Sequence, residues 1–265
     1  MSIMRIPLVF ICIVLSACYE TVQILDPSSN IDTRAKFADG AFLLSSVTVT
    51  TPSETRTFAR QQIKIYAQQH FAYGFFNKST NSVDAGAGKT EWRDSKLFET
   101  PLVNHAGKVS SLRFELDIQV NDQGFDQSID NMRSEEGLSY DLKETWQRLE
   151  GTGSDYDGLW QLRTHLIDGE QQVNPINEVK MIGGGHYIWF HHYALNDSQQ
   201  SHFGYGELKD NATTKRSMLD VTLQSSYAER LGQIKTVVLS LDEDDRLTET
   251  FKGVTSMVTK TYFRL

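Results

Sequence analysis

Cysteine is scarce in this chain: there are 2 among 265 residues, and both lie within the first 18 positions. An exported protein whose body has no cysteine forms no disulfide there and has no CxxC redox site. Positive charge is also in deficit, because 26 Lys and Arg stand against 34 Asp and Glu, for a formal net charge of −8. Proteins that bind nucleic acid carry a basic patch or stripe. The composition therefore excludes thiol chemistry in the body of the protein and predicts no nucleic-acid partner.

Long apolar runs are missing outside the N-terminus. Residues 6–14 form one such run, preceded by a short segment with the single cation Arg5 and followed by Leu15-Ser16-Ala17-Cys18. The run is shorter than the roughly 20 residues that a permanent membrane helix needs, and its flanks are typical of a cleavable export signal. We therefore expect residues 1–17 to be a signal peptide and no other segment to cross a membrane.

The residues around Cys18 resemble the lipobox of bacterial lipoproteins. The resemblance implies that Cys18 is acylated, becomes the first mature residue and anchors the protein to a membrane, with residues 18–37 as a polar tether. By the same resemblance, Tyr19 in place of an Asp favours the outer membrane. The expected location is therefore the bacterial cell envelope, facing the periplasm or the cell surface. The alternative is an ordinary signal peptide followed by an incidental cysteine.

What the chain does have is an internal repeat. The ending Thr-aromatic-x-Arg-Leu occurs at 145–149 and again at 261–265, an offset of 116 residues. His70-Phe71-Ala72-Tyr73 is answered by His186-Tyr187-Ile188-Trp189 at the same offset. Self-similarity at one period indicates a folding unit copied in tandem. We expect one copy over 38–150 and the second over 156–265, joined by a short segment rich in Gly and Ser.

Both copies alternate apolar and polar residues with a period of two, which is typical of β-strands. In the first copy the expected strands are 39–49, 61–66, 70–76, 84–92, 95–100, 109–120, 124–130 and 140–148. In the second copy they are 157–166, 177–182, 186–193, 201–209, 216–224, 234–241, 246–251 and 256–264. Helix signals are weak and limited to 130–137 and 225–231. The predicted fold is all-β, with two tandem eight-stranded antiparallel up-and-down barrels, since closure removes exposed edges; a two-sheet sandwich is the alternative.

The two ends of each copy favour closure. Trp160 follows Gly158 at the start of the first strand of copy two, and Arg264 lies on its last strand. In a closed sheet these strands are neighbours, so the guanidinium can cover the indole in a cation–π contact worth about 2 kcal/mol. Phe42 and Arg148 are the equivalent barrel-closing pair of copy one, and we expect that contact to be weaker.

Gly-x-Trp at the start and a lone Arg near the end resemble the signature of lipocalins and other calycin barrels. The chain also looks like the lipocalin-like secreted proteins of unknown function of Gram-negative bacteria. This resemblance implies barrels that hold a small molecule, although a second lipocalin motif of the Thr-Asp type is missing from the sequence.

An eight-stranded barrel is either filled by side chains or holds one small ligand. In copy two, alternation places Tyr187, Trp189 and His191 on one face of a strand, and we expect this face to point inward. We further expect the next strand to add Phe203, Tyr205 and Glu207 to an aromatic cup, and copy one to contribute Phe71, Tyr73 and Phe75. A packed aromatic core without a cavity is the alternative.

No catalytic, metal or cofactor site is predicted. His186, His191, His192 and His202 are close in sequence, but neither a carboxylate nor a cysteine accompanies them at ligand spacing. The run Asp242-Glu243-Asp244-Asp245 lacks the pattern of a calcium loop and is expected to be a hairpin turn. Sequence motifs of nucleophilic catalysis are missing as well.

These observations favour an envelope lipoprotein that binds a small apolar or amphipathic molecule as a carrier or sensor, with copy two as the working pocket. Two alternatives remain. One is an interaction module made of two filled barrels. The other is a cavity enzyme of isomerase type, for which Glu207 beside Tyr205 is the candidate pair.

Overall fold

The computed structural model describes residues 37–109, 111–133, 137–172, 176–195, 198–212 and 217–265. The predicted signal peptide, Cys18 and nearly all of the tether lie outside these residues. Within them, no helix is long and apolar enough to cross a membrane.

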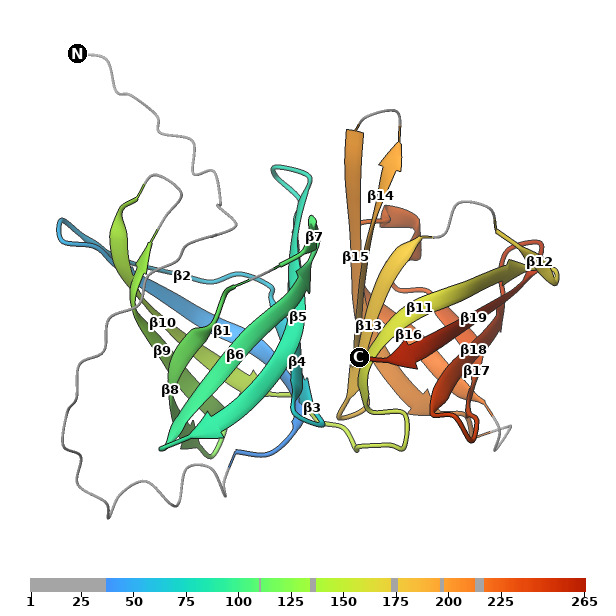
Figure 1. Cartoon of the computed structure of the whole chain (residues 1–265), viewed down its shortest axis with the longest axis horizontal. Helices are drawn as coiled ribbons and strands as arrows, with labels where there is room; N and C mark the ends of the chain where they lie inside the picture. The colour runs from blue at the N-terminus through green and yellow to red at the C-terminus, as the bar shows by residue number, and fades with distance from the viewer. Residues whose placement is uncertain (1–36, 110, 134–136, 173–175, 196–197, 213–216) are drawn as a thin grey trace.

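Barrel 1 is formed by the first copy (Figure 1). It consists of β1 (Gly40–Thr50), β3 (Ile63–Ala67), β4 (His70–Asn77), β5 (Ser82–Arg93), β6 (Lys96–Asn104), β8 (Phe114–Asn121), β9 (Gly124–Arg133) and β10 (Ser139–Arg148). Each strand pairs with the next antiparallel, and β1 pairs with β10 to close the sheet. The short strands β2 (Thr55–Phe58) and β7 (Gly107–Lys108) extend β1 and β6 at the edges.

Barrel 2 repeats this arrangement with the second copy. It consists of β11 (Gly158–Ile167), β13 (Asn177–Gly183), β14 (His186–Leu195), β15 (Ser198–Asp210), β16 (Met218–Ser225), β17 (Ile234–Leu241), β18 (Arg246–Lys252) and β19 (Met257–Arg264). It is closed by the pairing of β11 with β19, and the short β12 (Glu170–Gln171) pairs with β11. The predicted fold of two closed eight-stranded antiparallel barrels is confirmed, and the sandwich alternative is wrong.

The weak helix signals were misleading. Residues 130–133 belong to β9, where Met132 pairs with Tyr140 of β10, so the sheet's hydrogen bonds prevail there. Within 225–231 only the 3₁₀ turn η1 (Ala228–Arg230) is helical. The acidic run at 242–245 connects β17 to β18 as expected of a hairpin turn.

An arginine covers the aromatic residue at the base of each barrel. The Arg264 guanidinium lies 4.1 Å from the Trp160 ring centroid, and that of Arg148 lies 4.6 Å from the Phe42 ring centroid. Gly158 has φ +145°, and a Cβ there would overlap the Arg264 guanidinium, which explains glycine at this position. Arg264 also forms two hydrogen bonds to the Asp245 carboxylate, at 2.5 and 3.0 Å. Among the described residues, Arg148 donates hydrogen bonds to the backbone carbonyls of Ala38 and Asp39, at 2.7 and 3.0 Å.

This difference gives a first prediction. We expect Arg264→Met to lower the free energy of unfolding by about 2–3 kcal/mol, because it removes both the cation–π contact and the charged hydrogen bonds. Arg148→Met should cost about 1 kcal/mol less, since its ring partner is Phe and, within the described part of the chain, its hydrogen bonds go to backbone carbonyls rather than to a carboxylate. Urea unfolding of the two variants beside the parent measures the difference. Equal losses would contradict the stronger closure of barrel 2.

The two barrels share a third apolar core between them. The outer faces of β3, β4 and β5 pack against those of β13, β14 and β15 (Figure 1). Its buried members are Ala41, Ile63, Ile65, Ala67, Ala72, Val83, Ala85 and Ala87 from barrel 1 and Leu159, Val179, Met181, Ile188, Phe190 and Phe203 from barrel 2. Small residues on the barrel 1 side bring the sheets close: a Cβ at Gly74 would overlap the Phe203 ring.

Contacts across this interface are reciprocal. The β13–β14 turn at Gly184 packs against Gly40 at the start of barrel 1. The equivalent β3–β4 turn reaches the start of barrel 2, where the Gln68 side chain accepts a 2.7 Å hydrogen bond from Arg264. Equivalent elements thus contact each other in both directions, as in the isologous interface of a symmetric dimer. The connecting segment is held as well, because His186 Nε2 lies 2.9 Å from the Glu150 carbonyl oxygen.

Candidate ligand-binding site

Strand β3 of barrel 1 is buried on both faces. All five of its residues are buried, because Ile63 and Ile65 face barrel 2 while Lys64 and Tyr66 face the barrel interior. A lysine between two isoleucines is ordinarily the mark of a half-exposed strand. Here the second barrel takes the place of solvent, so Lys64 is forced inside.

Aromatic side chains fill the base of barrel 1. The Phe125 ring centroid lies 4.9 Å from that of Phe42 and 5.2 Å from that of Phe37, in edge-to-face arrangements. Tyr66 and Trp146 complete the cluster. Such pairs stabilise a core beyond the area they bury. The base of the barrel is therefore closed by these rings together with Arg148, which covers Phe42.

A buried polar network lies above these rings. Lys64 Nζ is 2.7 Å from Glu99 Oε1 and donates to Gln127 Oε1 at 3.1 Å. Gln127 in turn donates to Glu144 at 2.7 Å, and the Trp146 indole donates to the same carboxylate. Burial raises the pKa of Glu144 above its usual value, although Lys64 and Arg60 oppose the shift. Burial, followed by the neighbouring Glu99 carboxylate, raises the pKa of Tyr66 well above its usual value.

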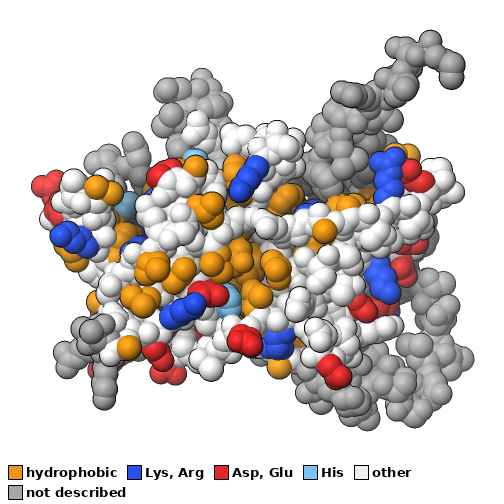
Figure 2. Space-filling model, turned by 180° about the vertical axis from the view of Figure 1, so that it is seen from behind, with side chains coloured by type: hydrophobic (Ala, Val, Ile, Leu, Met, Phe, Trp, Pro, Cys, Tyr) orange, Lys and Arg blue, Asp and Glu red, His pale blue; other side chains and the backbone are white. Residues whose placement is uncertain are grey.

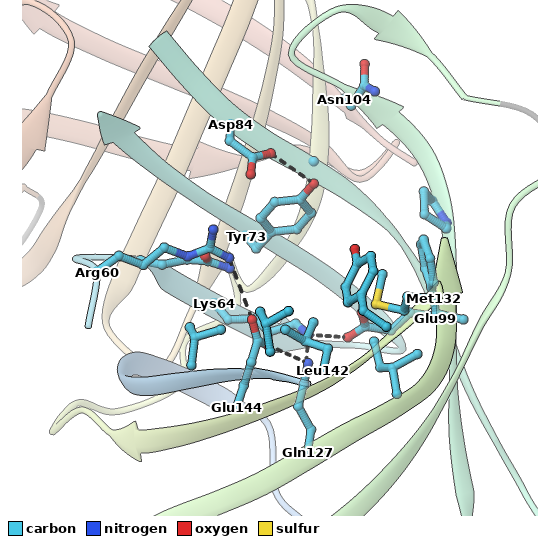
Figure 3. Close-up of a pocket in the computed structure, with 18 of the residues that line it drawn as sticks. Arg60, Lys64, Tyr73, Asp84, Glu99, Asn104, Gln127, Met132, Leu142 and Glu144 are labelled. Carbon is cyan, nitrogen blue, oxygen red and sulfur yellow. Dashed lines mark hydrogen bonds and ion pairs between the residues drawn. The ribbon is translucent and has the colours of Figure 1, made fainter. Parts of the chain in front are cut away.

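A cavity of about 460 Å³ opens above this network inside barrel 1 (Figure 3). Its volume lies within the range of pockets that bind small molecules. The polar floor is formed by Lys64, Glu99, Gln127 and Glu144. The walls are mostly apolar and include Val47, Val49, Phe58, Phe71, Val103, Leu112, Phe114, Ile129 and Leu142. The cavity thus joins apolar walls to a charged floor.

Barrel 2 carries an equivalent network with different charges. Lys180 occupies the place of Lys64, and its Nζ lies 2.5 Å from Glu249 Oε2. Where barrel 1 pairs Gln127 with Glu144, barrel 2 pairs Glu249 with Lys260 in the same register. Lys260 binds Glu178 at 2.7 Å, and the Tyr262 hydroxyl donates to Glu178 at 2.6 Å. Each of these carboxylates therefore has a lysine partner.

The carboxyl groups of barrel 2 are more acidic than usual. Burial alone raises the pKa of Glu249, but Lys180, Lys235 and Lys260 outweigh it and bring this pKa to about 2. The pKa of Glu178 is held well below its usual value because Lys260 and His191 outweigh burial. Glu144 of barrel 1 shifts in the opposite direction. Displaced pKa values also occur in structural ion-pair networks, and in barrel 2 they occur within one.

The predicted ligand-binding residues of barrel 2 separate into two groups. Tyr187, Trp189 and His191 point inward: Tyr187 donates to the Asp220 carboxylate at 2.5 Å, and Trp189 stacks on His191 at 5.2 Å between ring centroids. The space they fill is left by Gly204 and Gly206, where an added Cβ would overlap these rings.

Phe203, Tyr205 and Glu207 face outward instead, so their placement in the cup is wrong. Strand β15 pairs with β14 so that His191 is opposite His202 and Trp189 is opposite Gly204. The even-numbered residues of β15 therefore share the inner face, and Phe203 and Tyr205 pack at the interface between the barrels. Glu207 forms an ion pair with Lys209. The candidate catalytic pair thus lies outside the barrel.

The residues predicted in barrel 1 lie on its inner face. Phe71 and Tyr73 line the cavity. Phe75 is buried beside it, with the Arg60 guanidinium 4.8 Å from its ring centroid. The sequence favoured barrel 2 for the working pocket, whereas the cavity described above belongs to barrel 1.

The histidines of barrel 2 join an aromatic cluster with the turn at η1. His202 stacks on Tyr227 at 4.1 Å between centroids, and His191 Nε2 lies 3.2 Å from the Tyr227 hydroxyl. Burial, then His191 and Arg230, lowers the pKa of His202 to about 4. Among the described residues, no group of three or more His, Cys, Asp or Glu could hold a metal ion. The His192 side chain lies outside the described part.

No protein-family model matches the chain, and a search of curated proteins finds no match. The two closed barrels fit a tandem lipocalin-like architecture. The site must therefore be interpreted from its own geometry.

Proposed function

We propose that this protein binds a small amphipathic molecule in the barrel 1 cavity, as a carrier or sensor in the bacterial cell envelope. The observation that carries the proposal is the cavity of about 460 Å³ with apolar walls and a polar floor. Pockets of this composition fix a ligand's orientation through a few polar groups while apolar walls supply most of the contact. An amphipathic molecule matches both parts.

The envelope location rests on the sequence before and at Cys18, which resembles a lipobox. Lipidation there would tether the barrels to the outer membrane and leave the cavity within reach of molecules in the periplasm or at the cell surface. A single acyl chain anchors weakly, so stable attachment needs more than one. Labelling of the expressed protein with a fatty acid, and its loss in Cys18→Ser, tests this part.

An interaction module without a ligand is the second candidate. The outer face of β14, which would be expected to display aromatic residues, is buried against barrel 1 instead. Lys and Arg side chains are scattered singly among Asp and Glu on the face in Figure 2. Figure 2 also shows apolar side chains gathered near the middle of this face. The charged side chains form no basic surface for nucleic acid there, and the barrel 1 cavity remains the better supported site.

A cavity-filling substitution tests the proposed function. The apolar fluorescent dye N-phenylnaphthylamine is expected to bind the purified protein, and Leu142→Trp should weaken this binding at least tenfold, because the larger indole fills part of the cavity that Leu142 lines. Leu223→Trp is the matched control, since Leu223 is 39% exposed on barrel 2. Fluorescence titration gives both affinities.

Two outcomes would contradict the proposal as stated. Unchanged binding in Leu142→Trp together with loss in Trp189→Ala would move the site to barrel 2. Absence of any saturable dye binding to the folded parent would favour the interaction module.

A further inference from the structure

The charged side chains around the barrel 1 cavity do not balance. Its described lining contains four carboxylates and three cations, namely Glu54, Asp84, Glu99 and Glu144 with Arg56, Arg60 and Lys64. Three ion pairs use all the cations: Lys64 with Glu99 at 2.7 Å, Arg60 with Glu144 at 3.6 Å and Arg56 with Glu54 at 2.9 Å. Asp84 has no cation within ion-pair distance among the described residues.

Asp84 lies on β5 and is partly buried. Its carboxylate accepts one hydrogen bond, from the Tyr73 hydroxyl at 3.3 Å. Figure 3 shows this pair on the wall of the cavity, apart from the polar network around Lys64 and Glu144. A carboxylate with one long hydrogen bond retains acceptor capacity. The cavity therefore has an anionic point on its wall that no cation among the described residues neutralises.

Gln62 adds a second unused acceptor. Its side chain lines the cavity and is 4% exposed, and its Oε1 has no hydrogen-bond partner among the described residues. Buried polar atoms are nearly always paired in native proteins, so an unpaired one calls for a partner. Both unused groups accept hydrogen bonds. A ligand that completes these interactions must therefore donate hydrogen bonds. The group that lies beside the Asp84 carboxylate is expected to be a donor with a positive charge.

We propose that the barrel 1 cavity selects an amphiphile whose polar end is a protonated amine, with the ammonium group at Asp84. This inference rests on the proposed function of the same cavity. The Tyr73 ring beside Asp84 adds an aromatic surface, which attracts ammonium groups. The apolar part of the ligand lies along the walls formed by Val47, Val49, Ile129 and Leu142. A carboxylate-ended amphiphile would meet only cations that already have carboxylate partners.

Three probes with the same chain separate the ligand classes: decylamine, decanol and decanoate. Each is titrated against dye-loaded protein at pH 7, where an alkylamine is protonated. Decylamine is expected to compete about tenfold more tightly than decanol, and decanoate least well. Raising the salt concentration should reduce the preference for decylamine, because screening weakens a partly exposed ion pair.

Substitutions at the wall assign the preference to one residue. Asp84→Asn should reduce the affinity for decylamine about tenfold, to the level of decanol, and leave decanol unchanged. Asp122→Asn makes the same chemical change in the exposed β8–β9 turn and should alter neither. Tyr73→Phe removes the hydroxyl group that donates to Asp84, so the preference for decylamine over decanol should stay the same or increase. This variant provides a second test if Asp84→Asn does not fold.

The outcomes distinguish this inference from the proposed function. If the dye binds but decylamine competes no better than decanol, or if Asp84→Asn keeps the preference, selection of an amine is wrong and the cavity still stands. If the folded protein shows no saturable binding of the dye, the proposed function fails as well.

Discussion

Lys180→Met is expected to lower the free energy of unfolding by about 3–5 kcal/mol at pH 7, because it removes the lysine that forms the direct ion pair with the buried Glu249 carboxylate. Lys180 and Glu249 are both buried, and their charged atoms lie 2.5 Å apart. Urea denaturation followed by tryptophan fluorescence measures the loss. Lys209→Met is the matched control: that lysine pairs with Glu207 at the surface, where the change should stay within about 0.5 kcal/mol.

The effect of Lys180→Met depends on pH with a defined sign. The folded-state pKa of Glu249 is about 2 and its unfolded value is about 4.5. The depressed pKa stabilises the parent fully above about pH 4.5, and this contribution of roughly 3 kcal/mol is lost as the pH falls toward 2. In the variant the carboxyl group takes up a proton at higher pH. The gap between parent and variant should therefore be largest at pH 7 and shrink in acid.

A second substitution separates charge from packing. Lys180→Met combined with Glu249→Leu should recover most of the stability lost in Lys180→Met alone, because an apolar pair can replace a buried ion pair at little cost. A loss that stays constant between pH 7 and pH 3, or a double variant as unstable as the single one, would show that Lys180 acts through its packed methylene groups rather than its charge.

The strands and their closure could be predicted from the sequence, because alternation and the repeat each constrain the same elements. The expected strand at 234–241 matches β17 residue for residue, and the ends of most others lie within three positions of the expected ones. The exceptions are 95–100, where β6 continues to Asn104, and 109–120, where β8 begins at Phe114. Trp160 and Arg264 lie on strands that closure makes neighbours, and the repeat places Phe42 and Arg148 in the same relation.

The inward face of β15 could not be predicted from alternation alone. Alternation divides each strand into two faces but does not say which face of one strand joins which face of the next. In the structure Leu195 is opposite Ser198, so inward residues have odd numbers on β14 and even numbers on β15. Assigning Phe203 to the face of Tyr187 was a register error of one residue.

The polar interior was missed for a different physical reason. Lys64 and Lys180 occur at the same place in the repeat, and each lies between apolar residues. The same pattern is found in any strand with one face exposed to solvent. Both lysines point into their barrels because the outer face of each strand is covered by the other barrel. Ile63 and Ile65 of barrel 1, and Val179 and Met181 of barrel 2, are buried in the core between the barrels. Recurrence of a lysine in both copies was the available signal, but only the docking of the barrels shows that it is buried.

Ala72→Asp is expected to separate the two barrels thermodynamically. Ala72 is fully buried in the core between the barrels, on the face of β4 that points away from the interior of barrel 1. The side chains of that core's buried members are all apolar. A carboxylate placed there costs several kcal/mol unless it takes up a proton or reaches water. We expect Ala72→Asp to lower the free energy of unfolding by about 3–5 kcal/mol. The substitution weakens the contact between the barrels and leaves the interior of each barrel unchanged.

The parent should therefore unfold in a single calorimetric transition, because the shared core couples the barrels, and Ala72→Asp should split it into two. Ala212→Asp, at an exposed turn of barrel 2, is the control and should leave a single transition. Lowering the pH should partly restore coupling in Ala72→Asp, since a protonated carboxyl group is cheaper to bury. Two transitions already in the parent would mean that the interface adds little and that each barrel is stable by itself. If the parent and Ala72→Asp both unfold in one transition with the same midpoint, the sheets must separate enough at Ala72 for water to reach the carboxylate. The shared core would then not be the contact that couples the two barrels.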